Sequence, residues 1–186
     1  MGDAATTRWA RLARRLRVPL GFVLAAFYLW RARPTWTSLS IGTAIVLLGL
    51  IIRALAAGHI RKNLALTATG PYAHVRHPLY LGSLLLGIGF AIAGRDVWTW
   101  AAMLLLFLLI YVPVIRSEEA YLARQFPEYD DYARRVPALL PSRTSARELG
   151  SGFSRQLYMQ HHEYNALLGA AAMLAALLIK IAYFAK

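Results

Sequence analysis

The sequence predicts an all-α, polytopic membrane protein of about five transmembrane helices, with a cytoplasmic helical cap and no Rossmann domain. Of its 186 residues, 58% are apolar and only 16% are charged, whereas a soluble domain averages about 45–50% apolar and about 25% charged residues. The apolar residues also gather in a few long runs. Because each membrane-spanning helix needs about 20 residues, we expect residues 1–186 to form one membrane domain, without a separate soluble nucleotide-binding domain.

Five apolar runs are the predicted spans. They cover about 18–30, 37–57, 79–94, 97–115 and 165–184. The third run holds 16 residues, which at 1.5 Å per residue cover only about 24 Å of a hydrocarbon core of about 30 Å, and the first run is shorter still. We therefore expect these two helices to extend into the adjoining loops or to lie partly against protein.

The basic residues predict the orientation, because Lys and Arg are enriched in cytoplasmic loops. With the N-terminus in the cytoplasm, fifteen of them lie on that side, in 1–17, 58–78 and 116–164, and four lie on the other side. No small-residue cleavage site follows the first apolar run, so we expect a retained span. The formal net charge of +12 then favours contact with the anionic cytoplasmic leaflet rather than with nucleic acid.

A first polar segment precedes the third span. Residues 70–82 read Gly-Pro-Tyr-Ala-His-Val-Arg-His-Pro-Leu-Tyr-Leu-Gly. Gly70-Pro71 is typical of a turn, and Pro78 suits the first turn of a helix, where a missing N–H costs nothing. The N-terminus of that helix would favour an anion. Anchoring at the membrane interface by Tyr and Arg is the alternative interpretation.

A second polar segment, 116–141, follows the fourth span. Glu118 and Glu119 lie where that span leaves the membrane, a position at which carboxylates usually have a partner or a function. Arg76 and Arg116 are available partners, so a structural salt bridge is the alternative. The segment then shows a helix-like pattern with an aromatic face, which would otherwise lie on the membrane surface. The pattern consists of Tyr121, Leu122, Phe126, Tyr129 and Tyr132.

The sequence does not predict a metal site. His74 and His77 are three residues apart, but Pro78 interrupts the helical geometry that would bring them together, and no Cys or carboxylate nearby completes a shell. The run 161–163 (His-His-Glu) lacks helical ligand spacing. The chain has no cysteine, which also excludes disulfides, thiolate ligands and a cysteine nucleophile.

Several further residues are expected to contact the membrane interface. Arg53 and Lys180 lie inside spans near their ends, where they are expected to snorkel to the headgroups. Trp98 and Trp100 fit an aromatic belt. The approach to the last span, 158–165, is interpreted as an interfacial anchor, and closure of a lateral opening for a lipid is the alternative.

The two polar segments together carry a family resemblance. The pattern Gly-Pro-Tyr-x3-Arg-His-Pro-x-Tyr-x-Gly starts at Gly70, and Glu-Glu-x2-Leu-x3-Phe-x2-Tyr-x2-Tyr-x3-Val-Pro-x3-Pro starts at Glu118. In this order, they resemble the isoprenylcysteine carboxyl methyltransferase family and the related phospholipid N-methyltransferases. The resemblance covers about 64–141, with motifs at 64–82 and 116–141.

This resemblance implies a helical membrane enzyme that binds S-adenosylmethionine in a cytoplasm-facing active site, capped by the segment after span four. Carried over by position, the cofactor contacts are Leu66, Tyr72, His77, Pro78, Leu79, Tyr80 and Glu118. The candidate catalytic residues are Arg76, Arg116 and Glu119. Two positions depart from the family pattern: Val114 replaces a substrate-contacting arginine, whose nearest equivalent is Arg116, and Pro127 replaces a glycine.

The chemistry of these residues fits that assignment. His77 with a helix N-terminus suits the cofactor's carboxylate, Glu118 suits its ammonium or ribose hydroxyls, and Tyr72 and Tyr80 can surround the adenine or sulfonium. A carboxylate acceptor needs an arginine and no base, whereas an amine acceptor must lose a proton, for example to Glu119.

We therefore expect methyl transfer to a lipid-like or isoprenoid-linked acceptor, with carboxylate O-methylation favoured. The alternatives are an NADPH-dependent reductase of isoprenoid or sterol double bonds, or a non-enzymatic membrane subunit. The expected partners are the lipid-like substrate and membrane lipids, and the oligomeric state is open.

Overall fold

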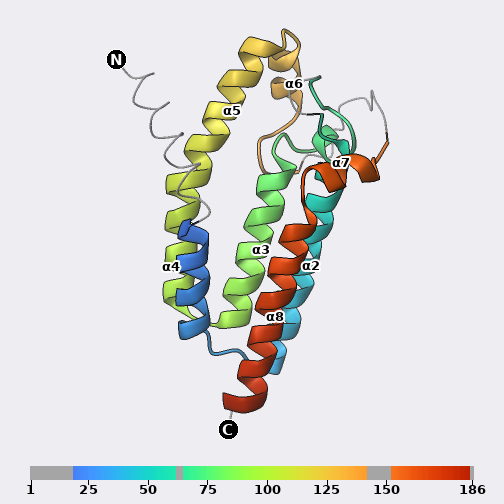
Figure 1. The fold of residues 1–186 in the computed structure, drawn as a ribbon. Coiled ribbons are helices and arrows are strands. Elements are labelled where there is room, and N and C mark those ends of the chain that lie inside the picture. The colour runs from blue at the N-terminus through green and yellow to red at the C-terminus, as the bar shows by residue number, and fades with distance from the viewer. Residues whose placement is uncertain (1–18, 62–64, 142–151, 185–186) are drawn as a thin grey trace. The chain divides into compact units, whose positions relative to one another are not determined.

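The computed structural model describes residues 19–61, 65–141 and 152–184, and every regular element within these ranges is helical. The predicted all-α fold without a Rossmann sheet is thus confirmed for the described residues. Several basic residues used to predict the orientation lie outside them, namely those of 1–17 and Lys62, Arg143, Arg147 and Lys186. The elements (Figure 1) are an unlabelled helix Pro19–Arg31, α2 Trp36–His59, the 3₁₀-helix η1 Gly70–Ala73, α3 Pro78–Gly94, α4 Val97–Leu106, the π-helix η2 Phe107–Tyr111, α5 Val112–Gln125, α6 Tyr129–Arg135, α7 Arg155–Gln160 and α8 Tyr164–Phe184.

The helices follow the five predicted apolar runs. Trp36–His59, Val97–Gln125 and Tyr164–Tyr183 are long and apolar enough to cross a membrane, and Pro19–Arg31 and Pro78–Gly94 are shorter apolar helices. The fourth helix differs from the prediction, because it continues about ten residues past the expected end at 115. Glu118 and Glu119 therefore lie within a continuous helix rather than at its end.

A π-turn explains how this long helix accommodates a proline. Pro113 has no N–H to donate to the carbonyl four residues earlier. Just before it, the N–H of Val112 bonds to the carbonyl of Phe107, five residues back, and Phe107–Tyr111 is π-helical. The rings of Phe107 and Tyr111 stack with their centroids 5.3 Å apart. The helix thus continues through the proline with a local change of register.

The chain divides into two compact units. The first unit comprises 1–46, 87–119 and 171–186, and the second comprises 47–86 and 120–170.

The first unit has an apolar core around the Pro19–Arg31 helix. The core consists of Tyr28, Ala32, Leu39, Ala93, Leu177 and Ile181. Gly42 and Gly89 let α2 and α3 approach closely, because a Cβ on Gly89 would lie 2.7 Å from the Gly42 carbonyl. Lys180 does not point to the headgroups as predicted: its Nζ donates to the carbonyls of Leu29 and Trp30 at 2.6 and 3.2 Å. It thereby satisfies carbonyls that the end of that helix leaves without intrahelical donors.

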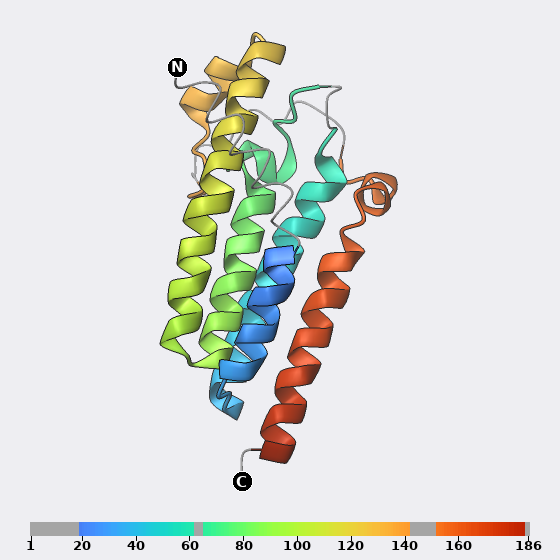
Figure 2. The ribbon, with the colours of Figure 1, turned by 60° about the vertical axis from the view of Figure 1, so that its left-hand side comes forward.

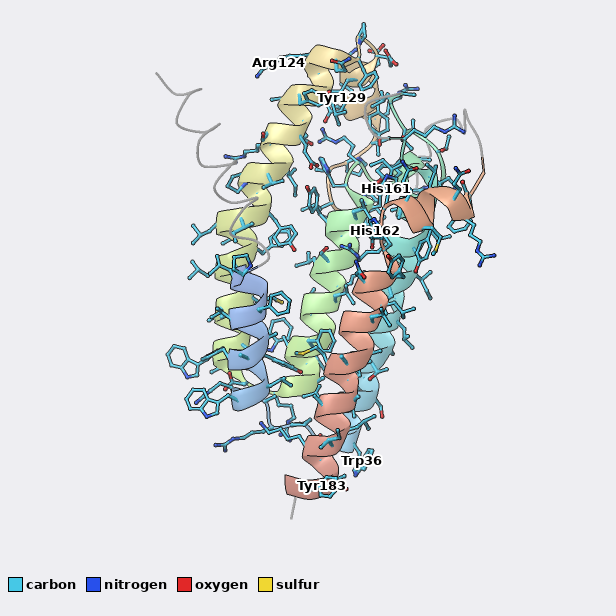
Figure 3. The ribbon with its side chains drawn as sticks, viewed as in Figure 1. Trp36, Arg124, Tyr129, His161, His162 and Tyr183 are labelled. Carbon is cyan, nitrogen blue, oxygen red and sulfur yellow. The ribbon has the colours of Figure 1, made fainter. Side chains whose placement is uncertain are left out.

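The same unit carries a capped turn and exposed aromatic side chains. Asp96 caps α4 by accepting from the Thr99 N–H at 2.9 Å, and it pairs with Arg31 at 2.8 Å. Burial opposes ionisation of Asp96, but the hydrogen bonds from Arg31 and Thr99 outweigh it and lower its pKa. Figure 3 shows Trp36 and Tyr183 at the same end of this unit. Trp30, Trp36, Trp98, Trp100 and Tyr183 are all exposed, as an interfacial belt requires.

The second unit contains the first polar segment and the part of the second that follows Glu119. Figures 1 and 2 show α6 folding back beside the last turns of α5. The helix ends there because Pro127 disfavours helical geometry in the residue before it, and α5 stops at Gln125. This break places α6 against the segment that precedes α3, as the next subsection describes.

Candidate functional site

The first motif begins with a turn that requires glycine. Gly70 has a φ of +56°, in the left-handed region that glycine adopts without strain. The ring of His59 also packs against it, so that a Cβ at Gly70 would lie 2.6 Å from the His59 Nε2. Pro71 then starts the 3₁₀-helix η1, which buries Tyr72 and Ala73. The Gly-Pro pair thus directs the following tyrosine into the protein.

Backbone hydrogen bonds join the two motifs. The Arg76 N–H donates to the Pro137 carbonyl at 2.9 Å, and the His77 N–H donates to the Ala138 carbonyl at 3.1 Å. The Tyr132 hydroxyl donates to the Tyr72 carbonyl at 2.8 Å. Segments about 60 residues apart in the sequence are therefore adjacent in the second unit, and the middle of the first motif meets the end of the second beside His77.

An apolar cluster supports this junction. Tyr129 and Tyr132 of α6 are each only 4% exposed, so these two tyrosines do not lie on the membrane surface, as the alternative interpretation of the second segment required. Tyr121 is 47% exposed on α5, because the break after that helix separates it from the other two tyrosines. The cluster consists of Ala73, Tyr129, Tyr132 and Val136, with Leu66, Ala68, Leu122, Phe126 and Ala133 packed against it.

Ionisation does not disturb the hydrogen bond of Tyr132. Burial raises the pKa of Tyr132 well above its ordinary value, so the phenol stays protonated and continues to donate. Arg76 approaches the same cluster, where its Nη1 donates to the Tyr129 hydroxyl at 3.4 Å. The predicted catalytic Arg76 thus lies beside the aromatic pair of α6.

His77 caps the start of α3. Its carbonyl accepts from the Tyr80 and Leu81 N–H groups at 3.1 and 3.0 Å, and Pro78 occupies the first position of the helix, as predicted. His77 is 6% exposed, and its ring centroid lies 5.7 Å from that of Tyr80. Leu79 and Tyr80 are half-buried.

The predicted cofactor contacts Leu66, Tyr72, His77, Pro78, Leu79 and Tyr80 all lie in the second unit, together with Arg76. Arg116, Glu118 and Glu119 lie on α5 in the first unit. Arg116 is exposed and the two glutamates are half-buried. The roles of these three residues in the site stay predictions.

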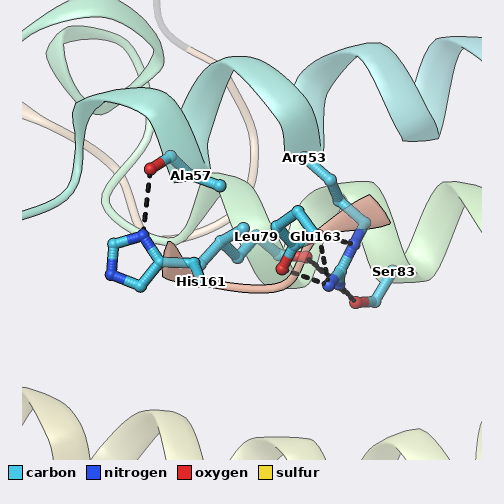
Figure 4. A network of polar contacts seen from close by, with 6 residues as sticks. All are labelled: Arg53, Ala57, Leu79, Ser83, His161 and Glu163. Carbon is cyan, nitrogen blue, oxygen red and sulfur yellow. Dashed lines mark hydrogen bonds and ion pairs between the residues drawn. The ribbon is translucent and has the colours of Figure 1, made fainter. Parts of the chain in front are cut away.

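Arg53 forms a polar network that the sequence reasoning missed (Figure 4). Its Nε and Nη2 bind the Glu163 carboxylate, with Nη2–Oε1 at 2.7 Å. Its Nη1 donates to the Ser83 hydroxyl and to the Leu79 carbonyl. The predicted snorkelling of Arg53 is therefore wrong. The sequence did contain a signal for this pairing, namely an arginine inside one span and a glutamate just before another. Buried charges in membrane proteins usually pair with each other.

Neighbouring polar residues extend this network. The His161 Nδ1 lies 3.1 Å from the Ala57 carbonyl. His162 has a φ of +54° in the turn between α7 and α8. Across the described ranges 19–61, 65–141 and 152–184, no group of three or more His, Cys, Asp or Glu is placed to hold a metal ion.

Comparison with known proteins identifies the family. The sequence model of the family described as phospholipid methyltransferase matches residues 17–129, which is more than half of the chain. The chain belongs to the phospholipid methyltransferase family. The matched region contains the whole first motif and the second as far as Tyr129. Together with the apolar helices, membership of this family makes the chain an integral membrane protein.

Curated relatives carry two kinds of name. The cobalt-zinc-cadmium resistance protein CzcN of Cupriavidus metallidurans is 40% identical over 132 residues, which are 67% of this chain and 61% of the relative. The nickel-cobalt-cadmium resistance protein NccN of Alcaligenes xylosoxydans xylosoxydans is 39% identical over 132 residues, 67% of this chain and 62% of the relative. The protein-S-isoprenylcysteine O-methyltransferase of Schizosaccharomyces pombe is 33% identical over 101 residues, 53% of this chain and 42% of the relative.

The chain thus spans 61–62% of the length of the two resistance proteins that it matches. No solved structure matches it significantly. The family that the motifs predicted is confirmed by the phospholipid methyltransferase match and by the isoprenylcysteine methyltransferase relative.

Proposed function

We propose that this phospholipid methyltransferase family member is an S-adenosylmethionine-dependent methyltransferase. Its acceptor is a lipid-like or isoprenoid-linked molecule, and its N-terminus and active site face the cytoplasm. The observation that carries the proposal is the junction at which the N–H groups of Arg76 and His77 bond to Pro137 and Ala138. It brings the middle of the first motif and the end of the second together beside a buried histidine that caps α3.

The residues at this junction fit the cofactor. S-adenosylmethionine, when bound, supplies a methyl group activated by its sulfonium. The His77 ring and the positive N-terminal end of α3 bind its carboxylate. The rings of Tyr72 and Tyr80 lie on either side of His77 in the sequence and provide the electron-rich faces that a sulfonium favours. Glu118 binds the ammonium or the ribose hydroxyls.

The favoured acceptor is a carboxylate. One curated relative is named for O-methylation of isoprenylcysteine, and a carboxylate oxygen attacks a methyl group without first losing a proton. Arg76, or Arg116 on α5, holds that carboxylate in line, and correct orientation supplies most of the acceleration. An amine acceptor would need a base, for which Glu119 is the candidate.

Equilibrium binding of S-adenosylhomocysteine to the detergent-purified chain tests the cofactor assignment. His77→Ala is expected to weaken binding at least tenfold, because it removes the side chain at the α3 cap. His162→Asn is the matched control, because His162 is exposed in a turn outside both motifs and Asn tolerates its positive φ. Equal affinity of the wild type and His77→Ala would contradict the assignment.

Transfer of a tritiated methyl group identifies the acceptor atom. A farnesylcysteine analogue supplies a carboxylate, and phosphatidylethanolamine supplies an amine. A methyl ester releases labelled methanol in alkali, whereas an N-methyl group does not. We expect alkali-labile label on the farnesylcysteine analogue. Alkali-stable label on phosphatidylethanolamine alone would contradict carboxylate methylation and leave the methyltransferase assignment intact.

A further inference from the structure

All three nitrogens of the Arg53 guanidinium donate hydrogen bonds within the second unit. Its Nε donates to Glu163 at 3.0 Å, and its Nη2 donates to both carboxylate oxygens of Glu163 at 2.7 and 2.8 Å. Its Nη1 donates to the Ser83 hydroxyl at 2.5 Å and to the Leu79 carbonyl at 3.3 Å. Arginine has five such donors in a fixed planar arrangement. One side chain therefore fixes α2, α3 and α8 in a single geometry (Figure 4).

The network ends on the part of α3 that carries the proposed cofactor contacts. Leu79 is in the first turn of α3, next to Pro78 and Tyr80 and two residues after the cap His77. The Ser83 hydroxyl also donates to the Leu79 carbonyl at 3.0 Å. Two side chains thus hold the same carbonyl, which lies two residues after His77 at the junction of the two motifs.

The last glycine of the first motif makes room for this arginine. A Cβ on Gly82 would lie 2.5 Å from the Arg53 Cγ and 2.8 Å from the Gly49 carbonyl. The stem of Arg53 therefore passes directly over the α3 backbone at a motif position. This close approach gives the motif glycine a structural reason and links Arg53 to the motif.

We propose that Arg53 and Glu163 are positioning residues that hold the first turn of α3 in the geometry that binds the cofactor. The inference rests on the proposed function, because it assigns Leu79 and its neighbours to the cofactor site. Glu163 lies beyond the residues that the family model matches. The start of α8 thus contributes to the site from outside the region of family similarity, through Arg53, without contacting the cofactor.

Three variants separate positioning from simple stabilisation. Glu163→Gln keeps the size of the side chain but removes its charge. The double variant Arg53→Glu with Glu163→Arg restores an ion pair, but glutamate at position 53 cannot donate to the Leu79 carbonyl. Arg31→Gln is the matched control, because it breaks the Arg31–Asp96 pair of the first unit, in which Asp96 also accepts from the N–H and hydroxyl of Thr99.

The unfolding midpoint of each purified full-length variant is measured first, and two further measurements are then made well below that midpoint. The first is the dissociation constant for S-adenosylhomocysteine, and the second is the rate of amide hydrogen exchange in 77–86. Glu163→Gln is expected to speed this exchange, because the first turn of α3 loses the support of the charged pair. It is also expected to raise the dissociation constant about tenfold, which corresponds to about 1.4 kcal/mol of binding free energy. The charge swap is expected to recover the unfolding midpoint but not the affinity, and Arg31→Gln is expected to keep wild-type affinity and exchange.

The outcomes separate the two claims. Unchanged exchange in Glu163→Gln would overturn the positioning role, whether or not the wild type binds the cofactor analogue. Faster exchange in Glu163→Gln with unchanged affinity for S-adenosylhomocysteine would overturn the link between the Arg53–Glu163 pair and the cofactor site. Recovery of affinity by the charge swap, or an equal loss of affinity in Arg31→Gln, would show general stabilisation and overturn the inference. Wild-type protein that binds no analogue would overturn the proposed function, while the exchange data would still decide the positioning role.

Discussion

Replacing Tyr132 by phenylalanine tests the junction between the two motifs directly. The substitution removes one hydroxyl, which donates to the Tyr72 carbonyl at 2.8 Å in a buried environment, and it keeps the ring in the apolar cluster. A typical hydrogen bond contributes about 0.5–1.5 kcal/mol net, and a buried group that loses its bond costs about 1–3 kcal/mol. Because Tyr132 is 4% exposed, water cannot readily replace the hydroxyl, and we expect a loss of about 1–3 kcal/mol.

Thermal unfolding followed by tryptophan fluorescence measures this loss in detergent. For a chain of this size, each kcal/mol corresponds to about 2–4 °C. Tyr121→Phe is the matched control, because it removes the same hydroxyl from a side chain that is 47% exposed. Surface substitutions usually change stability by less than about 0.5 kcal/mol, so the control is expected to unfold near the wild-type midpoint.

The pH dependence gives an independent check on the same hydrogen bond. Burial raises the pKa of Tyr132 above the ordinary tyrosine value of 10.0, so the folded state favours the protonated phenol. The protonated Tyr132 therefore contributes its full stabilisation of the folded state below about pH 10, and this stabilisation is lost as the pH rises further and the buried phenol must ionise. The difference in unfolding free energy between the wild type and Tyr132→Phe should therefore be constant from pH 6 to 9 and shrink above pH 10. Equal midpoints for Tyr132→Phe and the wild type throughout would refute the reasoning.

Two further predictions concern helix ends and close helix contacts. Asp96→Ala removes the cap of α4 and the partner of Arg31, and should lower the free energy of unfolding by about 1–2 kcal/mol at neutral pH. Because the pKa of Asp96 is lowered in the folded protein, this loss should diminish as the pH falls below 3.8. Acid unfolding of the wild type and of Asp96→Ala measures it. Gly89→Ala should cost about 1–3 kcal/mol, since its Cβ would lie 2.7 Å from the Gly42 carbonyl. Gly169→Ala, with nothing within 4 Å, should gain up to about 1 kcal/mol from helix propensity, and a comparison of unfolding midpoints checks both.

The spans could be predicted because hydropathy is a local property. Each apolar run is helical in the structure, and the shortness of the first and third runs is also observed. Hydropathy alone does not predict where a helix continues through a proline and where it ends at one. Pro113 is accommodated by a π-helical segment within a continuous helix, whereas Pro127 ends α5 at Gln125. The two outcomes depend on the surrounding packing, which a single sequence does not display.

The site could be predicted only as far as its motifs. Both motifs were located from the sequence, but their junction depends on backbone bonds to Pro137 and Ala138, which carry no side-chain signature. Arg53 was assigned to the headgroups because its partner Glu163 lies 110 residues away. Lys180 was misplaced for the same reason, since the carbonyls that it binds belong to a helix 150 residues earlier. Long-range pairing of polar groups is a property of the tertiary structure.

Thermal unfolding of the wild-type protein with and without S-adenosylhomocysteine tests the central claim most directly. At a concentration 100 times its dissociation constant, a ligand of the folded state stabilises it by about 2.7 kcal/mol. We predict a raised midpoint with S-adenosylhomocysteine and S-adenosylmethionine and none with NADPH. A midpoint unchanged by both methyl-transfer ligands, or raised by NADPH alone, would contradict the assignment of this chain as an S-adenosylmethionine-dependent methyltransferase.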